Sequence, residues 1–189
     1  PCGRVSGMQK VRSLYLVGPP GVGKTTLARE LLRRLDPGWT AYQTPAPKWT
    51  IVPGVLAAAG HYGGHPFDGA DRVPYNGVDE ALAYWTANLA EPLALFDGDR
   101  FSHASALAAI SRRGPVVVVH LTAPEAVVAE RLRGRGSRQD PVWAKGRATK
   151  AAGFADLASA AGFRVLELEA GEVGLLADAV CAGWTGAQA

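Results

Sequence analysis

Residues 13–26 read SLYLVGPPGVGKTT, and this stretch decides the fold. From Gly18 to Thr25 it matches the phosphate-binding pattern G-x-x-x-x-G-K-[ST] in full. The apolar run before the glycines is typical of a short buried strand, and the leucines after Lys24 recur with the period of an amphipathic helix. A strand, a glycine-rich turn and a helix in this order are the setting in which this pattern binds nucleotide phosphates. We therefore expect a phosphate-binding loop (P-loop).

The P-loop predicts a set of nucleotide contacts. Its backbone N–H groups lie at the positive N-terminus of a helix, where they can wrap a polyphosphate. We expect Lys24 to neutralise the charge of the β- and γ-phosphates and the Thr25 hydroxyl to hold Mg²⁺. The expected nucleotide-binding residues of the loop are Gly18, Gly21, Val22, Gly23, Lys24, Thr25 and Thr26.

Composition limits the class of protein. With 189 residues, of which 48% are apolar, the chain has the length of one α/β domain, and we interpret residues 1–189 as one, with 1–12 as an N-terminal extension. No apolar run approaches the ~20 residues of a membrane span and no signal peptide opens the chain, so we expect a cytoplasmic protein. The net charge of +3 suits a polyanionic partner but is small for a dedicated nucleic-acid binder. Cys2 and Cys181 lack metal-ligand spacing and are expected to be free thiols.

Strand and helix patterns alternate along the chain. We expect strands at 13–17, 40–42, 93–96, 116–121 and 164–168, with helices after the P-loop and at 79–89, 103–112, 124–133, 148–161 and 172–182. This alternation predicts an α/β three-layer sandwich of the P-loop NTPase type, with a parallel five-stranded sheet and helices on both faces. Residues 49–52 and 55–59 fit either a hairpin or short helices.

Two acidic residues follow the strand at 93–96. Asp97 and Asp99 lie at the carboxyl edge of the expected sheet, where open α/β sheets place their ligands. One of them should face Mg²⁺ and the phosphates, and the alternation of the strand does not determine which one. We treat both as catalytic candidates, and Asp97 as the candidate metal ligand because it resembles a Walker-B acid.

Basic residues cluster between positions 131 and 150, which we interpret as a lid. Arg131, Arg135 and Arg138 follow helical spacing and are expected to reach the nucleotide, the first two also as catalytic residues. Arg147 and Lys150 lie near Trp143, a mixture of cations and an indole that suits a nucleobase or a nucleic-acid backbone. A solvated basic helix face is the alternative.

A Gly- and Pro-rich stretch at 44–77 is the expected acceptor-binding insertion, because loops of this length in compact domains are usually functional. Asp71 is the candidate for deprotonating the acceptor hydroxyl, with Asp68, His61 and His65 as weaker ones. A turn or capping role is equally compatible with the two aspartates. Aromatic residues here, Tyr62, Phe67 and Tyr75, fit either a base-stacking or a core role. His103 and His120 are expected to be structural.

Four segments together resemble P-loop kinases of the thymidylate kinase group, and within it the phage kinases that phosphorylate 5-hydroxymethyluracil in DNA. They are the P-loop, FDGAD at 67–71, GDRF at 98–101 and WAKGRATK at 143–150. The resemblance implies ATP and Mg²⁺ as co-substrates, and a pyrimidine hydroxymethyl oxygen as the phosphoryl acceptor. It implies a catalytic and substrate-binding role for Arg100. The expected acceptor-binding residues are Phe67, Asp68, Asp71, Arg72, Arg100, Arg147 and Lys150.

Three hypotheses follow. The chain is a kinase for a modified base in DNA, a kinase for a free nucleotide, nucleoside or other small hydroxyl compound, or a non-enzymatic nucleotide switch. The long Gly- and His-rich insertion departs from thymidylate kinase and argues against free thymidylate. A monomer and a homodimer are equally compatible with the sequence.

Overall fold

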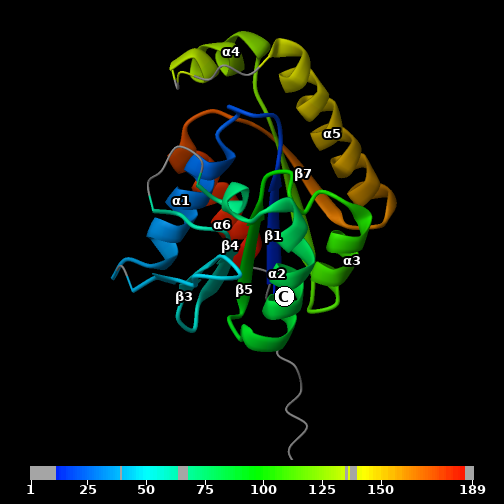
Figure 1. Cartoon of the computed structure of the whole chain (residues 1–189). Coiled ribbons are helices and arrows are strands. Elements are labelled where there is room, and N and C mark those ends of the chain that lie inside the picture. Colours follow the sequence, from blue (N-terminus) through cyan, green and yellow to red (C-terminus); the bar gives the residue numbers. More distant parts are fainter. Residues whose placement is uncertain (1–11, 39, 64–67, 135, 137–139, 186–189) are drawn as a thin grey trace, which may run out of the picture.

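The computed structural model describes residues 12–38, 40–63, 68–134, 136 and 140–185, which build a seven-stranded sheet flanked by helices (Figure 1). The strands are β1 (Arg12–Val17), β2 (Tyr42–Gln43), β3 (Trp49–Val52), β4 (Leu56–Ala59), β5 (Leu93–Asp97), β6 (Val116–Thr122) and β7 (Arg164–Glu169). The helices are α1 (Lys24–Leu35), α2 (Val78–Asn88), α3 (Ala104–Ser111), α4 (Glu125–Gly134), α5 (Pro141–Ala160) and α6 (Val173–Thr185), with short 3-10 helices η1 (Ala70–Arg72) and η2 (Tyr75–Gly77).

The α/β class with helices on both faces is confirmed, but the strand count is corrected. The spatial order is β2-β3-β4-β5-β1-β6-β7, and the pairs from β4 to β7 are parallel whereas β2-β3 and β3-β4 are antiparallel. The expected second strand at 40–42 is wrong in place and role, because β2 is an exposed pair of residues at the sheet edge. The fifth parallel strand is β4, whose four residues are all buried.

Of the two alternatives for residues 49–59, the structure contains the hairpin. Strands β3 and β4 pair antiparallel from Trp49↔Ala59 to Val52↔Leu56. Gly54 in the connecting turn has φ +71°, a left-handed conformation that glycine adopts at little cost. Burial of β3 on both faces explains why its side chains show no helical or alternating period.

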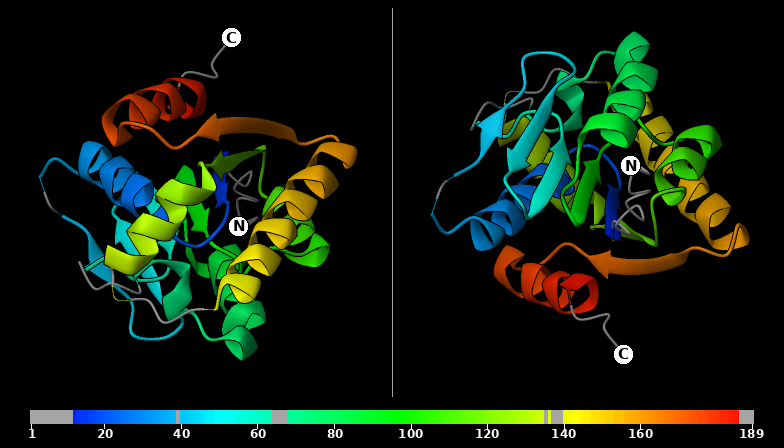
Figure 2. Two further views of the ribbon diagram at one scale, coloured as in Figure 1. Left: turned by 90° about the horizontal axis from the view of Figure 1, so that it is seen from above. Right: turned by 90° about the horizontal axis from the view of Figure 1, so that it is seen from below.

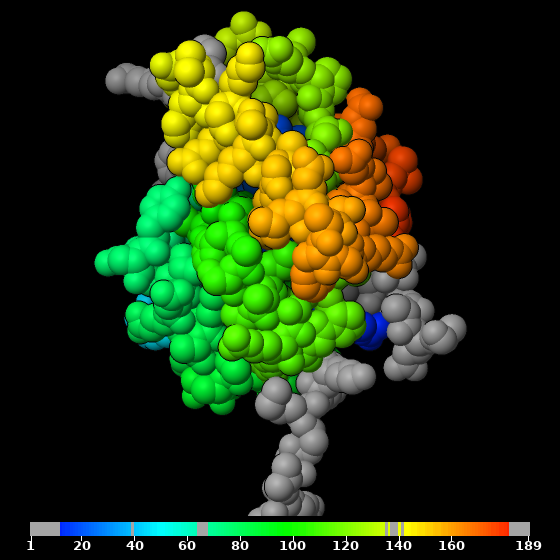
Figure 3. Space-filling view, turned by 90° about the vertical axis from the view of Figure 1, so that its right-hand side faces the viewer, coloured from blue at the N-terminus to red at the C-terminus, as the bar shows by residue number. Residues whose placement is uncertain are grey.

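Two apolar cores lie on opposite faces of the sheet. Helix α1 packs with α6 on one face, through the stripe Leu27, Ala28, Leu31 and Leu32 that the helical period predicts. Helices α2, α3 and α5 cover the other face, around Phe96 and Tyr15. Figure 2 shows this layering from above and below. In Figure 3, α5 (yellow to orange) lies across the upper part of one side of the molecule, against α3.

Helix α5 begins at Pro141, earlier than the expected start at 148. The Asp140 carboxylate caps it by accepting a hydrogen bond from the Val142 N–H at 2.8 Å, and proline at the first helical position has no N–H to leave unpaired. Residues 141–147, which we interpreted as part of the lid and not as helix, are therefore the first turns of a twenty-residue helix. Within the described ranges, no helix combines the length and the apolar character that crossing a bilayer requires.

Candidate nucleotide and acceptor site

The P-loop connects the carboxyl end of β1 to the first turn of α1. Gly23 is the N-cap of α1, so the helix begins at Lys24 and the N–H groups of its first turn are directed toward the loop. The Lys24 ammonium group donates to the carbonyl oxygens of Gly18 and Pro19 at 2.8 and 2.9 Å. The lysine thus lies over the loop, with its charge at the place where phosphate charge is expected.

Helix α4 lies over the P-loop. The Arg131 guanidinium donates to the Val22 carbonyl oxygen at 3.0 Å, which places this lid arginine on the loop itself. In Figure 1, α4 lies at the top of the molecule, above the segment that joins β1 to α1. Arg135 and Arg138, and Phe67 of the insertion, lie outside the described residues. Their expected roles stay predictions.

Asp97 is the buried acid of the site. Strands β1 and β5 are parallel neighbours, with Leu16 opposite Asp97. The carboxylate therefore lies beside the P-loop, which follows β1. Its Oδ2 accepts from the Thr25 hydroxyl at 3.4 Å. Its Oδ1 accepts from the Tyr62 hydroxyl at 2.9 Å and from the Ala70 N–H at 2.7 Å.

Burial raises the pKa of Asp97 to about 6, against the opposing effect of the Ala70 and Tyr62 hydrogen bonds and the Lys24 charge. The pKa of Tyr62 is raised well above its ordinary value, first by burial and then by the charge of Asp97. A buried carboxylate favours the approach of a positive charge.

The residues present fit Mg²⁺. Thr25 and Asp97 offer hydroxyl and carboxylate oxygens, which are the ligands that this hard cation prefers, and Mg²⁺ in nucleotide sites usually takes its other ligands from water and phosphate. Among the described residues, there is no group of three or more His, Cys, Asp or Glu side chains that could hold a metal ion.

Asp99 points elsewhere. It forms an ion pair with Arg147 of α5, and the Lys150 ammonium group donates to its carbonyl oxygen at 3.2 Å and lies 3.7 Å from its Oδ2. The two acids therefore differ in their contacts: Asp97 contacts Thr25, whereas Asp99 links the end of β5 to α5. That Asp97 is the acid that faces Mg²⁺ stays a prediction.

Asp71 forms a second acid–arginine pair. Its carboxylate lies 3.8 Å from Arg100, whose guanidinium carbon is 3.6 Å from the centroid of the Tyr75 ring. Partial loss of hydration raises the pKa of Asp71, and the Arg100 charge opposes that shift. An acid with a raised pKa is closer to the range of a general base at neutral pH.

These groups line one cleft with a volume of about 330 Å³. It combines the P-loop, the insertion, the turn after β5 and the first turns of α5. Its lining residues are Gly18, Pro20, Lys24, Asp71, Tyr75, Gly98, Asp99, Arg100, Trp143 and Arg147. The Arg147 guanidinium also lies over the Trp143 ring, 5.1 Å from its centroid. The structure thus brings Lys24, both acid–arginine pairs and two aromatic rings together.

The other candidate residues of the insertion that the structure describes contact neighbouring parts of the protein and do not line the cleft. Asp68 is buried, 2.8 Å from Arg29 of α1 and 3.7 Å from Arg72, and neither it nor Arg72 lines the cleft. Asp68 therefore ties the insertion to α1. His61 contacts the Thr44 carbonyl oxygen through Nε2 at 2.7 Å, and His65 lies outside the described residues.

The two histidines outside the insertion have the structural surroundings that we expected. His103 is the N-cap of α3 and accepts from the Ala106 N–H at 3.2 Å. His120 is buried in β6, with its Nδ1 3.4 Å from a Glu167 oxygen.

The sequence does not indicate the contact between Tyr62 and Asp97. Tyr62 is expected either to stack on a base or to lie in the core, whereas its hydroxyl contacts an acid 35 positions away. The only local signal is the abundance of glycine around it, because Gly60 and Gly69 permit a close crossing of two backbones. The identity of the partner depends on tertiary structure alone.

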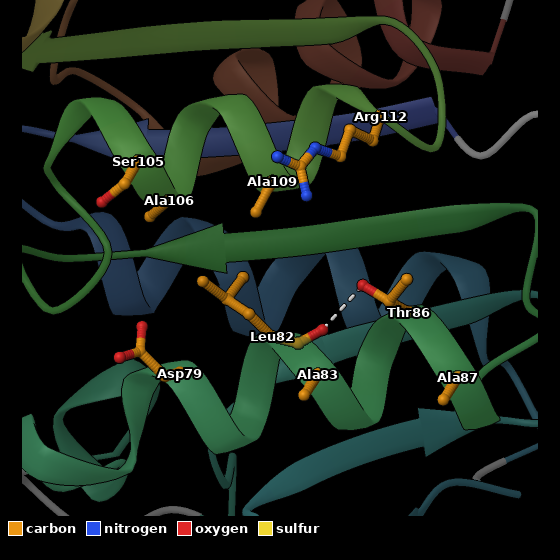
Figure 4. Close-up of a pocket in the computed structure, with 9 residues that line it drawn as sticks. All are labelled: Asp79, Leu82, Ala83, Thr86, Ala87, Ser105, Ala106, Ala109 and Arg112. Atoms are coloured by element: carbon orange, nitrogen blue, oxygen red, sulfur yellow. Dashed lines mark hydrogen bonds between the residues drawn. The ribbon is translucent and has the colours of Figure 1, made fainter.

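A second cavity, of about 470 Å³, lies between α2 and α3 (Figure 4). Its walls are mainly small side chains, with Asp79 and Arg112 toward opposite ends. The Thr86 hydroxyl donates a hydrogen bond to the Leu82 carbonyl oxygen at 2.8 Å. None of the expected site residues lines this groove.

Comparison with known proteins agrees with the fold. The family described as an AAA domain matches residues 14–150. Shikimate kinase from Acinetobacter baumannii, solved with shikimate, superposes with a TM-score of 0.51 at 18% identity, covering 96% of this chain and 97% of that chain. A gluconokinase from Sinorhizobium meliloti 1021 gives 0.49 at 12% identity, covering 94% of each chain. The tunicamycin resistance protein of Deinococcus radiodurans gives 0.47 at 21% identity, covering 92% of this chain and 95% of that one. No curated protein matches the sequence significantly. The chain thus has the α/β fold of the P-loop kinases.

Proposed function

We propose that this chain, which belongs to the AAA domain family, is an ATP-dependent kinase. The geometry of its cleft suits transfer of the γ-phosphoryl group to a hydroxyl oxygen. One observation carries the proposal. A single cleft joins the P-loop lysine, Lys24, to the acid–arginine pairs Asp71–Arg100 and Asp99–Arg147. A phosphoryl-transfer site needs this combination, because positive charge must face the phosphates while an acid receives the proton of the acceptor.

In the proposed reaction the acceptor oxygen forms a bond to the γ-phosphorus as the bond to the β–γ bridging oxygen breaks, and ADP leaves. Lys24 and Arg131 stabilise the charge that develops on the phosphoryl oxygens. Asp71 orients the acceptor hydroxyl and takes its proton, for which its raised pKa suits it. Thr25 and Asp97 would hold Mg²⁺, which when bound neutralises phosphate charge.

The acceptor that we propose is a hydroxymethylated pyrimidine, 5-hydroxymethyluracil in DNA. The volume of the cleft is near the lower end for small-molecule sites, so it suits a single ring rather than an extended ligand. Tyr75 and Trp143 both line it with partly exposed rings, and aromatic faces bind planar bases. Exposed Lys145 and Lys150 on α5 suit a phosphate backbone outside the cleft.

A free nucleoside, a nucleoside monophosphate or another small hydroxyl compound is the second candidate acceptor. The same small volume favours it, because nothing about the cleft requires a polymer. In that case the lysines of α5 would contribute little to acceptor affinity, and affinity would depend weakly on salt.

The deciding experiment offers ATP labelled in its γ-phosphate, with Mg²⁺, to two sets of acceptors. One set is duplex and single-stranded DNA containing 5-hydroxymethyluracil, with thymine DNA as the matched control. The other set is free nucleosides, nucleoside monophosphates and small polyols. Label in the modified DNA alone would support the DNA acceptor, and label only in a free compound would replace it with the second candidate. Release of inorganic phosphate without transfer to any acceptor would contradict the kinase proposal.

Lys24→Ala is expected to lower the transfer rate by at least ~10²-fold, because the variant lacks the cation that faces the phosphates. The side chain lies at the surface of the loop, so the fold should remain intact by circular dichroism. Lys48→Ala, which removes a lysine charge outside the cleft lining, is the control and should keep the wild-type rate. Wild-type turnover in Lys24→Ala would contradict the assigned role.

A further inference from the structure

We propose that Tyr62, Gly69 and Ala70, which we call the Asp97 clamp, hold the Asp97 carboxylate in its metal-binding orientation, with Tyr62 as a positioning residue. The inference rests on the proposed function, because it assigns the metal-facing oxygen of that site. It goes further, in that a segment expected only to bind the acceptor also sets the geometry of the nucleotide-metal side.

The two oxygens of Asp97 have different surroundings. Oδ1 accepts two hydrogen bonds from the clamp, one from the Tyr62 hydroxyl at 2.9 Å and one from the Ala70 N–H at 2.7 Å. Within the described part of the chain, Oδ2 accepts one hydrogen bond, the long one from Thr25 at 3.4 Å. A carboxylate oxygen has two lone pairs, so the clamp saturates Oδ1 and leaves Oδ2 with acceptor capacity on the side of the P-loop. Since rotation about the terminal carboxylate torsion is soft, two bonds on one oxygen fix the direction of the other.

The backbone of the clamp is built for this close approach. Gly69 has φ +86°, and a Cβ atom there would lie 2.7 and 2.8 Å from the two Asp97 oxygens. Any side chain at this position would therefore displace the carboxylate. A Cβ atom on Gly60 would lie 1.9 Å from the Gly69 carbonyl oxygen, so two glycines permit the segments to cross.

The crossing fixes both donors at once. The Gly69 N–H donates to the His61 carbonyl oxygen at 2.7 Å, and these two residues form an isolated antiparallel bridge. Tyr62 and Ala70 are their immediate chain neighbours, so the bridge sets the positions of the two groups that hold Oδ1. The hydrogen bond of Tyr62 is thus part of a preorganised unit rather than a chance contact of a mobile side chain.

The clamp also borders the acceptor cleft. Asp71, which lines the cleft, directly follows Ala70, whose N–H contacts Asp97. A shift of Asp71 would therefore move the Ala70 N–H, one peptide unit away, and with it the hydrogen bond to Asp97. Groups that orient metal ligands typically change metal affinity by 10–100-fold when they are removed.

The test is Tyr62→Phe, which deletes the hydroxyl and keeps the ring that fills its place. We would titrate Mn²⁺, as the probe for the Mg²⁺ site, into protein saturated with a non-hydrolysable ATP analogue, and measure affinity by calorimetry. Binding of Mn²⁺ should weaken about tenfold, whereas affinity for the analogue in EDTA should stay at the wild-type value. Tyr84→Phe, which removes a hydroxyl from a half-buried ring of α2, should leave both affinities unchanged.

Gly69→Ala attacks the clamp from its backbone side and should weaken Mn²⁺ binding in the same direction. A folded Tyr62→Phe protein with wild-type Mn²⁺ affinity would overturn the positioning role. The titration needs neither an acceptor nor turnover, so it is distinct from the test of the kinase itself. Failure of labelled transfer to every acceptor with weakened Mn²⁺ binding would reject the proposed function alone, and intact transfer with unchanged Mn²⁺ binding would reject the clamp alone.

Discussion

Asp97 and Asp99 stand two positions apart, yet their side chains serve different parts of the molecule. Asp97 ends β5 and is buried against the P-loop hydroxyl, whereas Asp99 follows a turn at Gly98, with φ +77°, and pairs with α5. Strand alternation places both on the same face, so it could not separate them. The turn breaks the alternation, and the neighbouring elements then supply different partners.

Because Asp97 is buried, we expect the free energy of unfolding of the protein without nucleotide to depend on pH. Its folded pKa of about 6 lies above the ordinary value of 3.8, so the folded state binds the proton more tightly. The stabilisation from this group is complete below pH 3.8 and is lost as the pH rises through 6. Asp97→Asn keeps an oxygen that accepts from Tyr62 and Ala70 but carries no charge. At pH 7.5 we expect its free energy of unfolding to exceed that of the wild type by ~1–3 kcal/mol, although it should bind metal poorly.

Urea denaturation at pH 7.5 and pH 4 measures this difference, which should shrink at the lower pH. The control is Asp79→Asn, which removes a carboxylate that lines the groove between α2 and α3 and is absent from the P-loop cleft. A difference of the same size at both pH values would show that charge burial is not its cause.

At the scale of elements, α5 begins earlier than we expected, because the residues that mark the start of a helix form only a short signal. The sequence QDPVW at 139–143 contains an aspartate followed by proline, which is a signal for the start of a helix, yet we expected the helix to start only at 148. The helix begins there, and this places Arg147 two turns inside it, where it can reach Asp99. The described residues of the lid that we expected at 131–150 thus belong mainly to the end of α4 and the first half of α5.

Removal of the α5 cap should destabilise the protein modestly. In Asp140→Ala the Val142 N–H loses its partner, and such losses typically cost about 1 kcal/mol of the free energy of unfolding. Asp156→Ala, at an exposed position in the same helix, is the matched control and should change stability little. Urea denaturation of both variants checks this. Equal stability of the two variants would mean that the Asp140 cap does not contribute to holding α5.

At the scale of the whole molecule, Phe96 is the centre of the larger core. Its ring contacts those of Tyr15, Trp49, Trp85 and Phe101, with centroids 5.4–6.2 Å away. These residues come from β1, β3, α2, β5 and the turn after β5. One buried ring in the strand next to β1 therefore contacts segments from residue 15 to residue 101, and the candidate site lies at the end of that same strand.

Phe96→Ala should cost about 3–5 kcal/mol of the free energy of unfolding, because a fully buried ring is replaced by a cavity among other aromatic side chains. Denaturant titration followed by tryptophan fluorescence measures it, since Trp49 and Trp85 report on this core. Leu175→Ala, at a largely exposed leucine of α6, should cost less than about 0.5 kcal/mol. A small loss in Phe96→Ala would indicate that the cluster rearranges to fill the cavity.

The fold class, the P-loop between β1 and α1, and the edge of the sheet that carries the candidate site could all be predicted from the amino-acid sequence. These follow from local rules: a glycine-rich turn needs particular residues in order, and parallel strands deliver their carboxyl ends to one edge. Three contacts could not be predicted in this way: Asp97 with Thr25, Asp68 with Arg29 of α1, and Tyr62 with Asp97. The two residues of these contacts are 72, 39 and 35 positions apart in the sequence, respectively. The contact of Tyr62 also depends on the close crossing of the backbone at Gly60 and Gly69. Periodicity carries information over a few turns of chain, whereas the pairing of distant charges and hydroxyls is fixed only when packing brings the segments together.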